Sequence, residues 1–434
     1  MTDHRRELKT DERPMIKNIK IFRFKSIKDL SLNLGRVNIF VGGNGAGKSN
    51  ILEAIGLASA ALHRGLGDSD LTKKGVRLTP VELMKASFKS DRVAASFEIA
   101  VEFSGGVEYR CNLLSKENDP LLRFHSESCS FEGVKQFGRS GNGSTVHGNS
   151  IKTRLEKDRG MWDQIKVAYS FPENLTKQCD EFGRYAIYTP QTDILRGARS
   201  GVIDAAPFGL HGEGLPSALA SVVARMHKEK NKFFKDLIYN ALSLCFLPGW
   251  TNSVKVGKID TKLISRGMQD KNSDMVYFID KFMNTKRNTL SVYDSSEGTF
   301  FLLFIALLLS HEDSPRYFAL DNVDSALNPS MTRRLIEKII EFTEIVSSKN
   351  LPFGPKQIFL TSHNPTSLDA FDLFNPDQRI FIVNRDKEGA TCVTRLEPPS
   401  GMTRDEWRVQ AQGKNLSQLW LEDKIEGING IGDI

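Results

Sequence analysis

The stretch Gly42-Gly43-Asn44-Gly45-Ala46-Gly47-Lys48-Ser49 decides the fold of this chain, because it fits the pattern G-x-x-x-x-G-K-[ST] at every fixed position. Before it, Val37–Val41 is a short apolar run of the strand type. After it, the segment 50–62 carries apolar residues at helical spacing, namely Ile51, Leu52, Ile55, Ala58 and Leu62. A strand, a glycine-rich turn and a helix in this order predict a phosphate-binding loop.

The chemistry of such a loop explains its residue types. Its backbone N–H groups point at one place, and the positive end of the following helix dipole adds to them, so phosphate is attracted. Gly45 and Gly47 remove side chains that would block the approach. We expect Lys48 to reach the β- and γ-phosphates of a nucleotide and the Ser49 hydroxyl to help hold Mg²⁺. The predicted nucleotide site is therefore residues 42–49 together with Asn50.

Length and composition describe an ordinary folded protein. The chain has 434 residues, of which 40% are hydrophobic and 26% are charged. This is enough apolar material for a large core and argues against gross disorder. The formal net charge of +6 permits contact with nucleic acid without requiring it.

The cysteines and the apolar runs indicate the cellular compartment of the protein. Five cysteines are scattered without a C-x-x-C pair, namely Cys111, Cys129, Cys179, Cys245 and Cys392. This pattern disfavours a disulfide framework and a zinc site and favours a reducing cytoplasm. The charged segment 1–14 has no apolar core, so we do not expect a secretory signal. The longest apolar run, 300–309, is about half the length that crosses a bilayer, which predicts a buried helix and no membrane contact.

The chain before the phosphate loop predicts a tail and two strands. Residues 1–14 are expected to form a charged tail. Apolar residues alternate over Ile16–Phe24, a turn follows at Lys25-Ser26, and a second strand is expected at 30–34. We take residues 15–434 as a single head.

An antiparallel β subdomain is predicted over residues 93–131. The runs 93–103 and 107–114 alternate around a glycine-containing turn, which indicates a hairpin, and 121–131 adds a third strand. The following segment, 137–148, is rich in glycine and serine and predicts a mobile loop.

A mainly helical insert is predicted at about 197–285. Apolar residues recur at helical spacing from Leu215 and again over 233–244, and short strands are expected near 251–256 and 275–278. A basic cluster lies on the helical part, namely Lys228, Lys230, Lys232 and Lys235. Such clusters are usually a solvated helix face, and DNA contact is the alternative.

A second group of motifs lies in the lobe 286–395. The apolar run Tyr317–Leu320 ends in Asp321, and we expect this carboxylate, from a strand neighbouring the phosphate-loop strand, to order Mg²⁺. The run 357–360 ends in Thr361-Ser362-His363. Upstream, residues 295–299 read SSEGT, which contains the triplet S-x-G at Ser296 and Gly298. Asp321 follows Ser296 by 25 residues, and His363 follows Asp321 by 42.

Together these motifs resemble the ATP-binding-cassette (ABC) ATPases of the RecF, SMC and OLD type. The likeness covers residues 15 to about 395 and is greatest to compact bacterial ATPases, generically described as AAA family, that are often found in phage-defence operons. The matching segments are IFRFKSIKDL, GGNGAGKSN, SSEGT at the signature position, YFALD as the Walker B strand, SALNP as the dimer loop and TSHNP with the switch histidine. The resemblance implies an α/β fold: a P-loop ABC-type ATPase head with an antiparallel β subdomain, an inserted mainly helical subdomain and no long coiled coil.

The resemblance also implies a mechanism. Two heads would dimerise face to face, each holding ATP between its phosphate loop and Ser296 and Gly298 of the other head. Lys48, Mg²⁺ and His363 would meet the charge that develops on the γ-phosphate. Gln191, after the predicted strand 185–188, is the candidate for coupling Mg²⁺ to the helical region, the alternative being a solvated glutamine.

Asn322 departs from the pattern of the group. The residue after the Walker B aspartate is normally a glutamate that orients or deprotonates the attacking water. An amide can orient water but cannot accept a proton at neutral pH. We therefore expect slow hydrolysis, or a base elsewhere, with Asp324 the nearest carboxylate in sequence.

Two functions compete. The first is an ATP-gated switch that controls a partner effector, a nuclease or toxin from a neighbouring gene, in antiviral defence. The second is a RecF-like DNA-binding repair ATPase, which the mild basicity and the lysine cluster favour. A nuclease of the OLD type would need a further domain, and only 71 residues follow His363. A transporter subunit is a weaker alternative, because Ser296 follows Lys48 by 248 residues.

The C-terminal extension, 396–434, contains an apolar segment at 416–425. Leu416, Leu419, Trp420 and Leu421 lie close together there, before a glycine-rich end. We predict a docking or oligomer helix, and the alternative is that Trp420 covers the core of the head itself.

Overall fold

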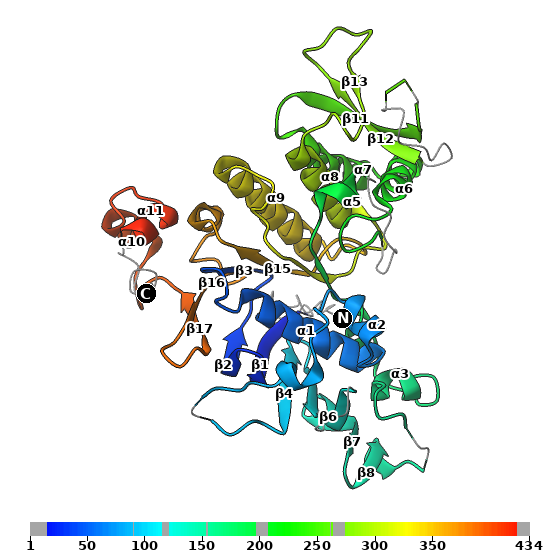
Figure 1. Ribbon diagram of the computed structural model, residues 1–434, viewed down its shortest axis with the longest axis vertical. Coiled ribbons are helices and arrows are strands. Elements are labelled where there is room, and N and C mark those ends of the chain that lie inside the picture. Colours follow the sequence, from blue (N-terminus) through cyan, green and yellow to red (C-terminus); the bar gives the residue numbers. More distant parts are fainter. Residues whose placement is uncertain are drawn as a thin grey trace, which may run out of the picture.

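The computed structural model describes residues 15–89, 91–114, 121–152, 155–196, 207–260, 262–263 and 274–422 (Figure 1). The predicted charged tail, 1–14, and the last residues of the C-terminal extension, 423–434, lie outside this part of the chain. Within it, no helix is both long and apolar enough to span a bilayer.

A six-stranded sheet forms the centre of the molecule (Figure 1). Its strands, in spatial order, are β10 (Ala186–Tyr188), β14 (Tyr317–Leu320), β15 (Gln357–Ser362), β3 (Val37–Val41), β16 (Gln378–Arg385) and β17 (Thr391–Leu396). The first five are parallel, and β17 pairs with β16 in the antiparallel sense at the edge. The strand beside β3 is β15, so β14, which precedes Asp321, is one strand farther away than the sequence suggested.

Both faces of this sheet are buried, and side chains alternate between two cores. On β3, Val37, Ile39 and Val41 belong to one core, which also contains α8 (Glu297–Ser310) and much of α9 (Pro329–Ser348). Phe40 belongs to the other core, with α1 (Lys48–His63). The helix predicted at 300–309 is therefore confirmed as a buried helix, α8, which is apolar on all sides.

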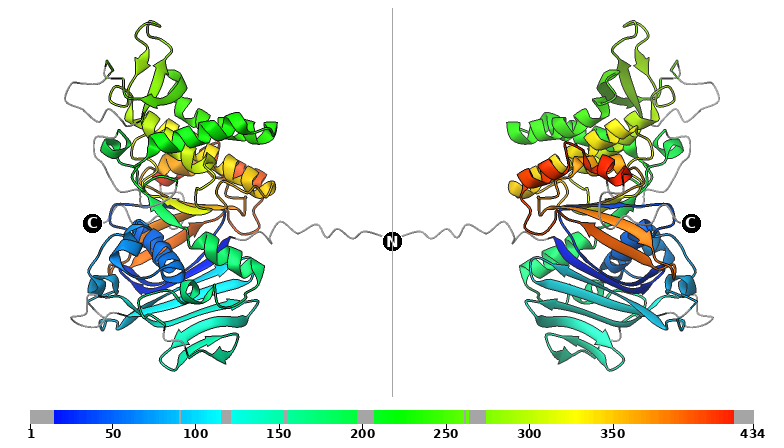
Figure 2. Two further views of the ribbon diagram at one scale, coloured as in Figure 1. Left: turned by 90° about the vertical axis from the view of Figure 1, so that its right-hand side faces the viewer. Right: turned by 90° about the vertical axis from the view of Figure 1, so that its left-hand side faces the viewer.

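An eight-stranded antiparallel sheet covers the other side of α1 (Figure 2). Its strands, in order, are β2 (Ile27–Asn33), β1 (Ile16–Phe24), β4 (Ser96–Phe103), β5 (Val107–Leu114), β6 (Arg123–Phe131), β7 (Val134–Ser140), β8 (Gly143–Val146) and β9 (Asn149–Ser150). This sheet extends beyond the stretch 93–131 at both ends of the order.

The predicted mobile loop at 137–148 is wrong, because these residues form most of the β7–β8 hairpin. Phe137 and Val146 pair across the hairpin and are buried in the core around α1. The glycines serve the turn and the close approach of strands: Gly143 has φ +119°, and a Cβ on Gly138 would lie 2.7 Å from the Glu127 carbonyl oxygen.

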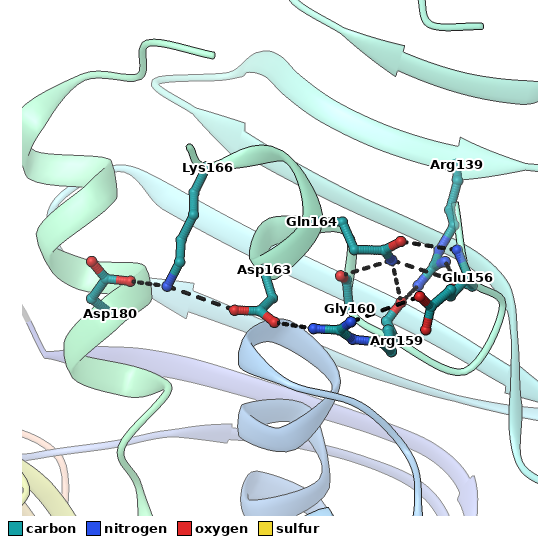
Figure 3. Close-up of polar contacts among 8 residues, drawn as sticks. All are labelled: Arg139, Glu156, Arg159, Gly160, Asp163, Gln164, Lys166 and Asp180. Atoms are coloured by element: carbon teal, nitrogen blue, oxygen red, sulfur yellow. Dashed lines mark hydrogen bonds and ion pairs between the residues drawn. The ribbon is translucent and has the colours of Figure 1, made fainter. Parts of the chain in front are cut away.

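Two short helices, α3 (Met161–Ile165) and α4 (Glu173–Phe182), pack beside α1 in the core of the antiparallel sheet. Figure 3 shows a line of polar contacts there, in which Lys166 lies 3.4 Å from Asp180 and Arg159 lies 2.8 Å from Asp163. Arg139 donates to the backbone of the loop before α3. These pairs are partly exposed, so each adds little stability, and the contacts chiefly fix the loop.

An upper lobe carries helices and a small sheet (Figure 1). Its described elements are α5 (Thr192–Leu195), α6 (Leu215–Lys228), α7 (Lys232–Leu242), η2 (Ser243–Phe246), β11 (Thr251–Lys258), β12 (Asp274–Asp280) and β13 (Thr289–Leu290). The predicted insert, 197–285, thus contains two strands of a three-stranded sheet beside its helices, and the third strand, β13, follows it directly. Residues 197–206, 261 and 264–273 lie outside the described part. The remaining short elements are α2 (Asp68–Thr72), η1 (Val81–Met84), η3 (Pro365–Ala370), α10 (Arg404–Gln410) and α11 (Leu416–Leu421).

The C-terminal helix α11 packs on the head itself. Leu416, Leu419 and Trp420 are buried in the core that contains α8 and α9, and Trp420 is only 6% exposed. Ser417 fixes the helix by donating to Asp369 at the end of η3, through both its N–H and its hydroxyl at 2.8 Å. These side chains are therefore not free to dock a partner, and of the predicted docking helix only the part up to residue 422 is described.

Replacing Trp420 by alanine is expected to destabilise the head by about 3–5 kcal/mol, the usual cost of deleting a buried aromatic side chain. Leu421→Ala is the matched control, because Leu421 is 75% exposed and should change stability by less than about 0.5 kcal/mol. Urea unfolding of both variants checks this. Equal stabilities would show that α11 does not belong to the core.

Candidate functional site

The phosphate loop connects β3 to α1, and two of its glycines have no substitute. Gly47 has φ +109°, and a Cβ there would lie 2.1 Å from the Thr391 Oγ1. A Cβ on Gly42 would lie 2.1 Å from the Val383 carbonyl oxygen. Around Gly43 and Gly45, by contrast, a Cβ would meet nothing within 4 Å. The loop is thus clamped at its ends and open in the middle, the shape of a cradle for an anion.

The clamp comes from the β16–β17 edge of the sheet, which sequence reasoning missed. Thr391 on β17 donates to the Ala46 carbonyl oxygen at 2.9 Å, and Arg385 on β16 donates to the Gly45 carbonyl oxygen at 2.9 Å. Asn50 donates through Nδ2 to the Ser26 hydroxyl at 2.6 Å. The first two bonds occupy the carbonyl groups of Gly45 and Ala46, and the third ties the first turn of α1 to the turn after β1.

Lys48 lies against its own loop and is 5% exposed. Its Nζ donates to the carbonyl oxygens of Gly42 at 2.7 Å and Gly43 at 2.9 Å and lies 3.2 Å from His363 Nδ1. Burial lowers the pKa of Lys48, and Asp321 opposes this shift. The ammonium is thus held at the loop by neutral acceptors, which an anionic phosphate can outcompete.

Ser49 and Asp321 meet at the first turn of α1. Ser49 Oγ donates to Asp321 Oδ2 at 3.0 Å, and Thr361 at the end of β15 donates to the other carboxylate oxygen. The backbone N–H of Asn322 donates to the Thr361 hydroxyl at 2.8 Å. A hydroxyl beside a carboxylate is an oxygen donor set that suits Mg²⁺, which uses one or two protein groups together with phosphate oxygens. The described residues contain no group of three His, Cys, Asp or Glu side chains that could hold a metal alone.

Asn322 and His363 extend this site as a chain of contacts that ends at Lys48. His363 Nε2 lies 2.9 Å from Asn322 Oδ1, and His363 Nδ1 lies 3.2 Å from Lys48 Nζ. An ammonium only donates, so Nδ1 must accept and the ring proton sits on Nε2, where it donates to the amide oxygen. This arrangement requires a neutral imidazole, and it uses the one oxygen that Asn322 has.

Asp324 lies next to this chain but faces the backbone after β15. Its Oδ2 accepts from the Ser362 hydroxyl at 3.0 Å and from the N–H groups of His363 at 3.0 Å and Asn364 at 2.9 Å. Three donors on one oxygen fix the loop that carries His363. The contacts favour a positioning role for this carboxylate over a role as a base.

Ser296 and Gly298 lie at the start of α8, on the face of the central sheet opposite to α1 (Figure 1). Ser296 caps the helix by accepting from the Thr299 N–H at 3.3 Å. Gly298 sits against the predicted dimer loop, since a Cβ there would lie 3.0 Å from the Ala326 carbonyl oxygen. The structure therefore brings together the signature and dimer-loop segments, with the signature at the start of a helix on the sheet face opposite to α1.

Gln191 follows β10 and is exposed. Its Nε2 lies 3.4 Å from His211 Nδ1. Beside it, a cavity of about 410 Å³ opens next to Ser49 and Asp321, and Gln191 is not among the residues that line it. The other lining residues are Glu53, Thr72, Gly75, Val76, Arg77, Leu78, Ile187, Thr189, Leu210, His211 and Glu213. None of these was singled out from the sequence, because they belong to no common motif.

Two charged residues of the cavity form one ionic cluster. Glu53 on α1 is buried and pairs with Lys25 at 2.5 Å and with Arg77. Arg77 also donates to Asn50 Oδ1 at 3.0 Å. The cluster joins the turn after β1 to the first turns of α1, and within it the charge of Glu53 is matched by two cations.

Comparisons with known proteins agree with this geometry. The family model AAA_21, described as "AAA domain, putative AbiEii toxin, Type IV TA system", matches residues 37–369. A curated relative, the DNA replication and repair protein RecF of Heliobacterium modesticaldum (strain ATCC 51547 / Ice1), is 28% identical over 215 residues, which are 48% of this chain and 52% of the relative. The chain thus spans about half the length of that relative.

Solved structures of SMC heads are also similar. The SMC head bound to the C-winged helix domain of ScpA has a TM-score of 0.50 at 15% identity, over 89% of this chain and 99% of that one. The SMC head domain from Thermotoga maritima has a TM-score of 0.39 at 14% identity, over 88% and 99%. The first likeness shows that the fold is that of an SMC-type head.

The family match runs from the phosphate-loop strand to η3, so it includes both halves of the site. The resemblance inferred from the motifs is confirmed. The chain belongs to the AAA_21 family and is an ABC-type ATPase of the RecF/SMC superfamily.

Proposed function

We propose that this protein is a slow, ATP-gated switch, in which bound ATP holds two heads together and the closed state controls a partner effector. The observation that carries the proposal is the chain of contacts from Asn322 through His363 to Lys48. It places an amide at the position where this group of ATPases has a carboxylate, and the ring nitrogen of His363 that could accept a proton, Nδ1, already accepts from Lys48.

ATP binding is supported by the loop. Its middle is open, its carbonyl groups are occupied, and Lys48 is within reach of an anion placed there. Ser49 and Asp321 would hold Mg²⁺, which supplies charge neutralisation at the phosphates when bound. A γ-phosphate that draws Lys48 away would leave His363 Nδ1 without its donor, while Asn322 Oδ1 keeps the ring oriented.

Slow hydrolysis follows from the two residues that could replace the usual glutamate. Asn322 accepts from His363 through its only oxygen, and its NH₂ group can donate to water but not deprotonate it. Asp324 already accepts three hydrogen bonds through one oxygen, and its other oxygen is buried. General-base assistance typically contributes about 10²–10⁴-fold, so its loss leaves a long-lived ATP state.

Dimerisation is supported by the separation of the two half-sites. Ser296 and Gly298 begin α8 on the far side of the central sheet, where they could complete the site of a second head and not their own. An effector partner, a nuclease or toxin encoded nearby, fits the toxin–antitoxin wording of the family description and a role in antiviral defence. Such a partner would read the closed state.

A RecF-like function in DNA repair is the alternative. It is favoured by the RecF relative and by four exposed lysines at α6 and α7, namely Lys228, Lys230, Lys232 and Lys235. DNA binding through them would weaken steeply with salt. A salt-dependent affinity for DNA that rises when ATP is added would favour this alternative.

The dimer can be tested by complementation. Lys48→Ala is expected to lower ATP affinity by roughly 100-fold, because the loop loses its cation, and Ser296→Arg to block the opposing surface. Neither variant should hydrolyse ATP alone. A mixture should recover roughly a quarter of the wild-type rate, since half of the dimers are mixed and each has one complete site. A mixture without activity, together with a monomer in light scattering at all ATP concentrations, would contradict the dimer.

Asn322→Glu is expected to raise steady-state phosphate release roughly ten-fold or more, because a carboxylate can act as the base. Asn322 has φ +58°, a left-handed conformation that costs glutamate about 1 kcal/mol or more. Asn350→Glu is the matched control, because Asn350 is exposed after α9 and has φ +49°. It should show a similar loss of stability without faster hydrolysis.

The opposite pattern of hydrolysis rates would assign the general base to another residue. Fast wild-type hydrolysis that Asn322→Glu leaves unchanged and Asp324→Asn abolishes would contradict the slow switch. It would assign proton transfer to Asp324.

A further inference from the structure

The loop 209–214 forms a wall of the cavity next to Ser49 and Asp321, and its shape depends on glycine. Gly212 has φ +116°, and a Cβ there would lie 2.4 Å from Leu195 Cδ2. A Cβ on Gly209 would lie 2.0 Å from Glu213 Oε2. The loop therefore folds so that the Glu213 carboxylate lies over residue 209, where any larger residue would displace it.

Hydrogen bonds hold this loop against the end of β10. The N–H of Thr189 donates to the Leu210 carbonyl oxygen, and the N–H of Gln191 donates to that of His211, both at 3.0 Å. His211 Nδ1 lies 2.9 Å from Thr189 Oγ1 and 3.4 Å from Gln191 Nε2. The Glu213 carboxylate accepts from the His211 N–H at 3.1 Å. The imidazole is thus held by Thr189 and Gln191, and the carboxylate is held by the backbone of His211.

The same strand end is joined to the Walker B position. The N–H of Asp321 donates to the Tyr188 carbonyl oxygen at 3.1 Å, directly before Thr189. The cavity between them is lined by Ser49 and Asp321 on one side and by His211 and Glu213 on the other. Its volume of about 410 Å³ is room for on the order of ten waters.

Charge distinguishes Glu213 from the other acids of this cavity. Glu53 is neutralised by two cations, and Asp321 accepts from Ser49 and Thr361 with both oxygens. The described contacts of Glu213 use Oε2 alone, so Oε1 is left for water. A carboxylate with a spare oxygen, facing the side of the site where Mg²⁺ would bind, is suited to hold metal-bound water.

We propose that His211 and Glu213 form a second wall of the nucleotide site and hold water molecules bound to the Mg²⁺ of Mg–ATP. The inference rests on the proposed function, because it requires ATP at the phosphate loop. Both residues act as positioning residues, Glu213 through water and His211 by orienting Thr189 and Gln191. Because Gly214 caps α6, which packs on α8, the loop also connects this wall to the helix that begins with the signature segment.

The test measures binding of a fluorescent ATP analogue, with Mg²⁺ or with EDTA, to the full chain. In Glu213→Gln, the Mg²⁺ concentration for half-maximal enhancement of binding should rise roughly ten-fold, the usual effect of removing a partner that orients metal ligands. The affinity in EDTA should be unchanged, because the phosphate loop is intact. The half-maximal Mg²⁺ concentration should also rise in His211→Ala, and it should rise less in His211→Asn.

Glu102→Gln is the matched control, because Glu102 is exposed on β4 in the other sheet. It should leave the Mg²⁺ dependence unchanged. Glu213→Gln keeps the size of the side chain, so the packing over Gly209 is preserved, and thermal melting checks the fold. Glu213→Asp serves as a second variant if Glu213→Gln fails to fold.

The outcomes separate the two claims. Suppose that the wild type binds Mg–ATP and that the Glu213 and His211 variants fold and bind it with the same dependence on Mg²⁺ as the wild type. The second wall is then contradicted, and the proposed function stands. If the wild type does not bind ATP at all, the proposed function fails and this inference fails with it.

Discussion

Asp321 accepts one hydrogen bond from Ser49 and one from Thr361, and the arrangement of the whole site depends on this carboxylate. Ser49 and Asp321 are 272 residues apart in the chain, so the two bonds join α1, β14 and β15 at one point. The Asp321 N–H adds β10 through Tyr188. The parallel order of these strands places their carboxyl ends on the same edge, and the carboxylate is available there for the ligand of the phosphate loop.

Much of this was predictable from sequence, for a physical reason. The phosphate loop and Asp321 follow buried strands directly, so local pattern determines where they lie. Thr391, which holds the loop from β17, could not be found, because its contact depends on which strand forms the sheet edge. The β7–β8 hairpin was missed because glycine composition outweighed the alternation of Phe137 and Val146. The apolar residues of α11 fitted both docking and burial, and tertiary packing decides for burial, whereas the wall of His211 and Glu213 has no local signal.

Two physical features of the site favour asparagine at residue 322. Its φ of +58° is a conformation that asparagine tolerates better than glutamate, so the amide relieves backbone strain. Its single oxygen also accepts from His363 Nε2, which orients the ring so that Nδ1 faces Lys48. An amide in place of the usual carboxylate suits the proposed switch, which needs a long-lived ATP-bound state more than it needs turnover.

The lifetime of bound ATP tests this account most directly. In a single-turnover experiment, excess protein is mixed with labelled ATP and Mg²⁺, and bound ATP and ADP are separated over time. The account predicts that ATP remains intact in the complex, with a hydrolysis rate below roughly 0.1 per second, well under the rate of about 10 per second that is typical of enzymes. Conversion of all bound ATP to ADP within a second, by the wild-type chain alone, would contradict it.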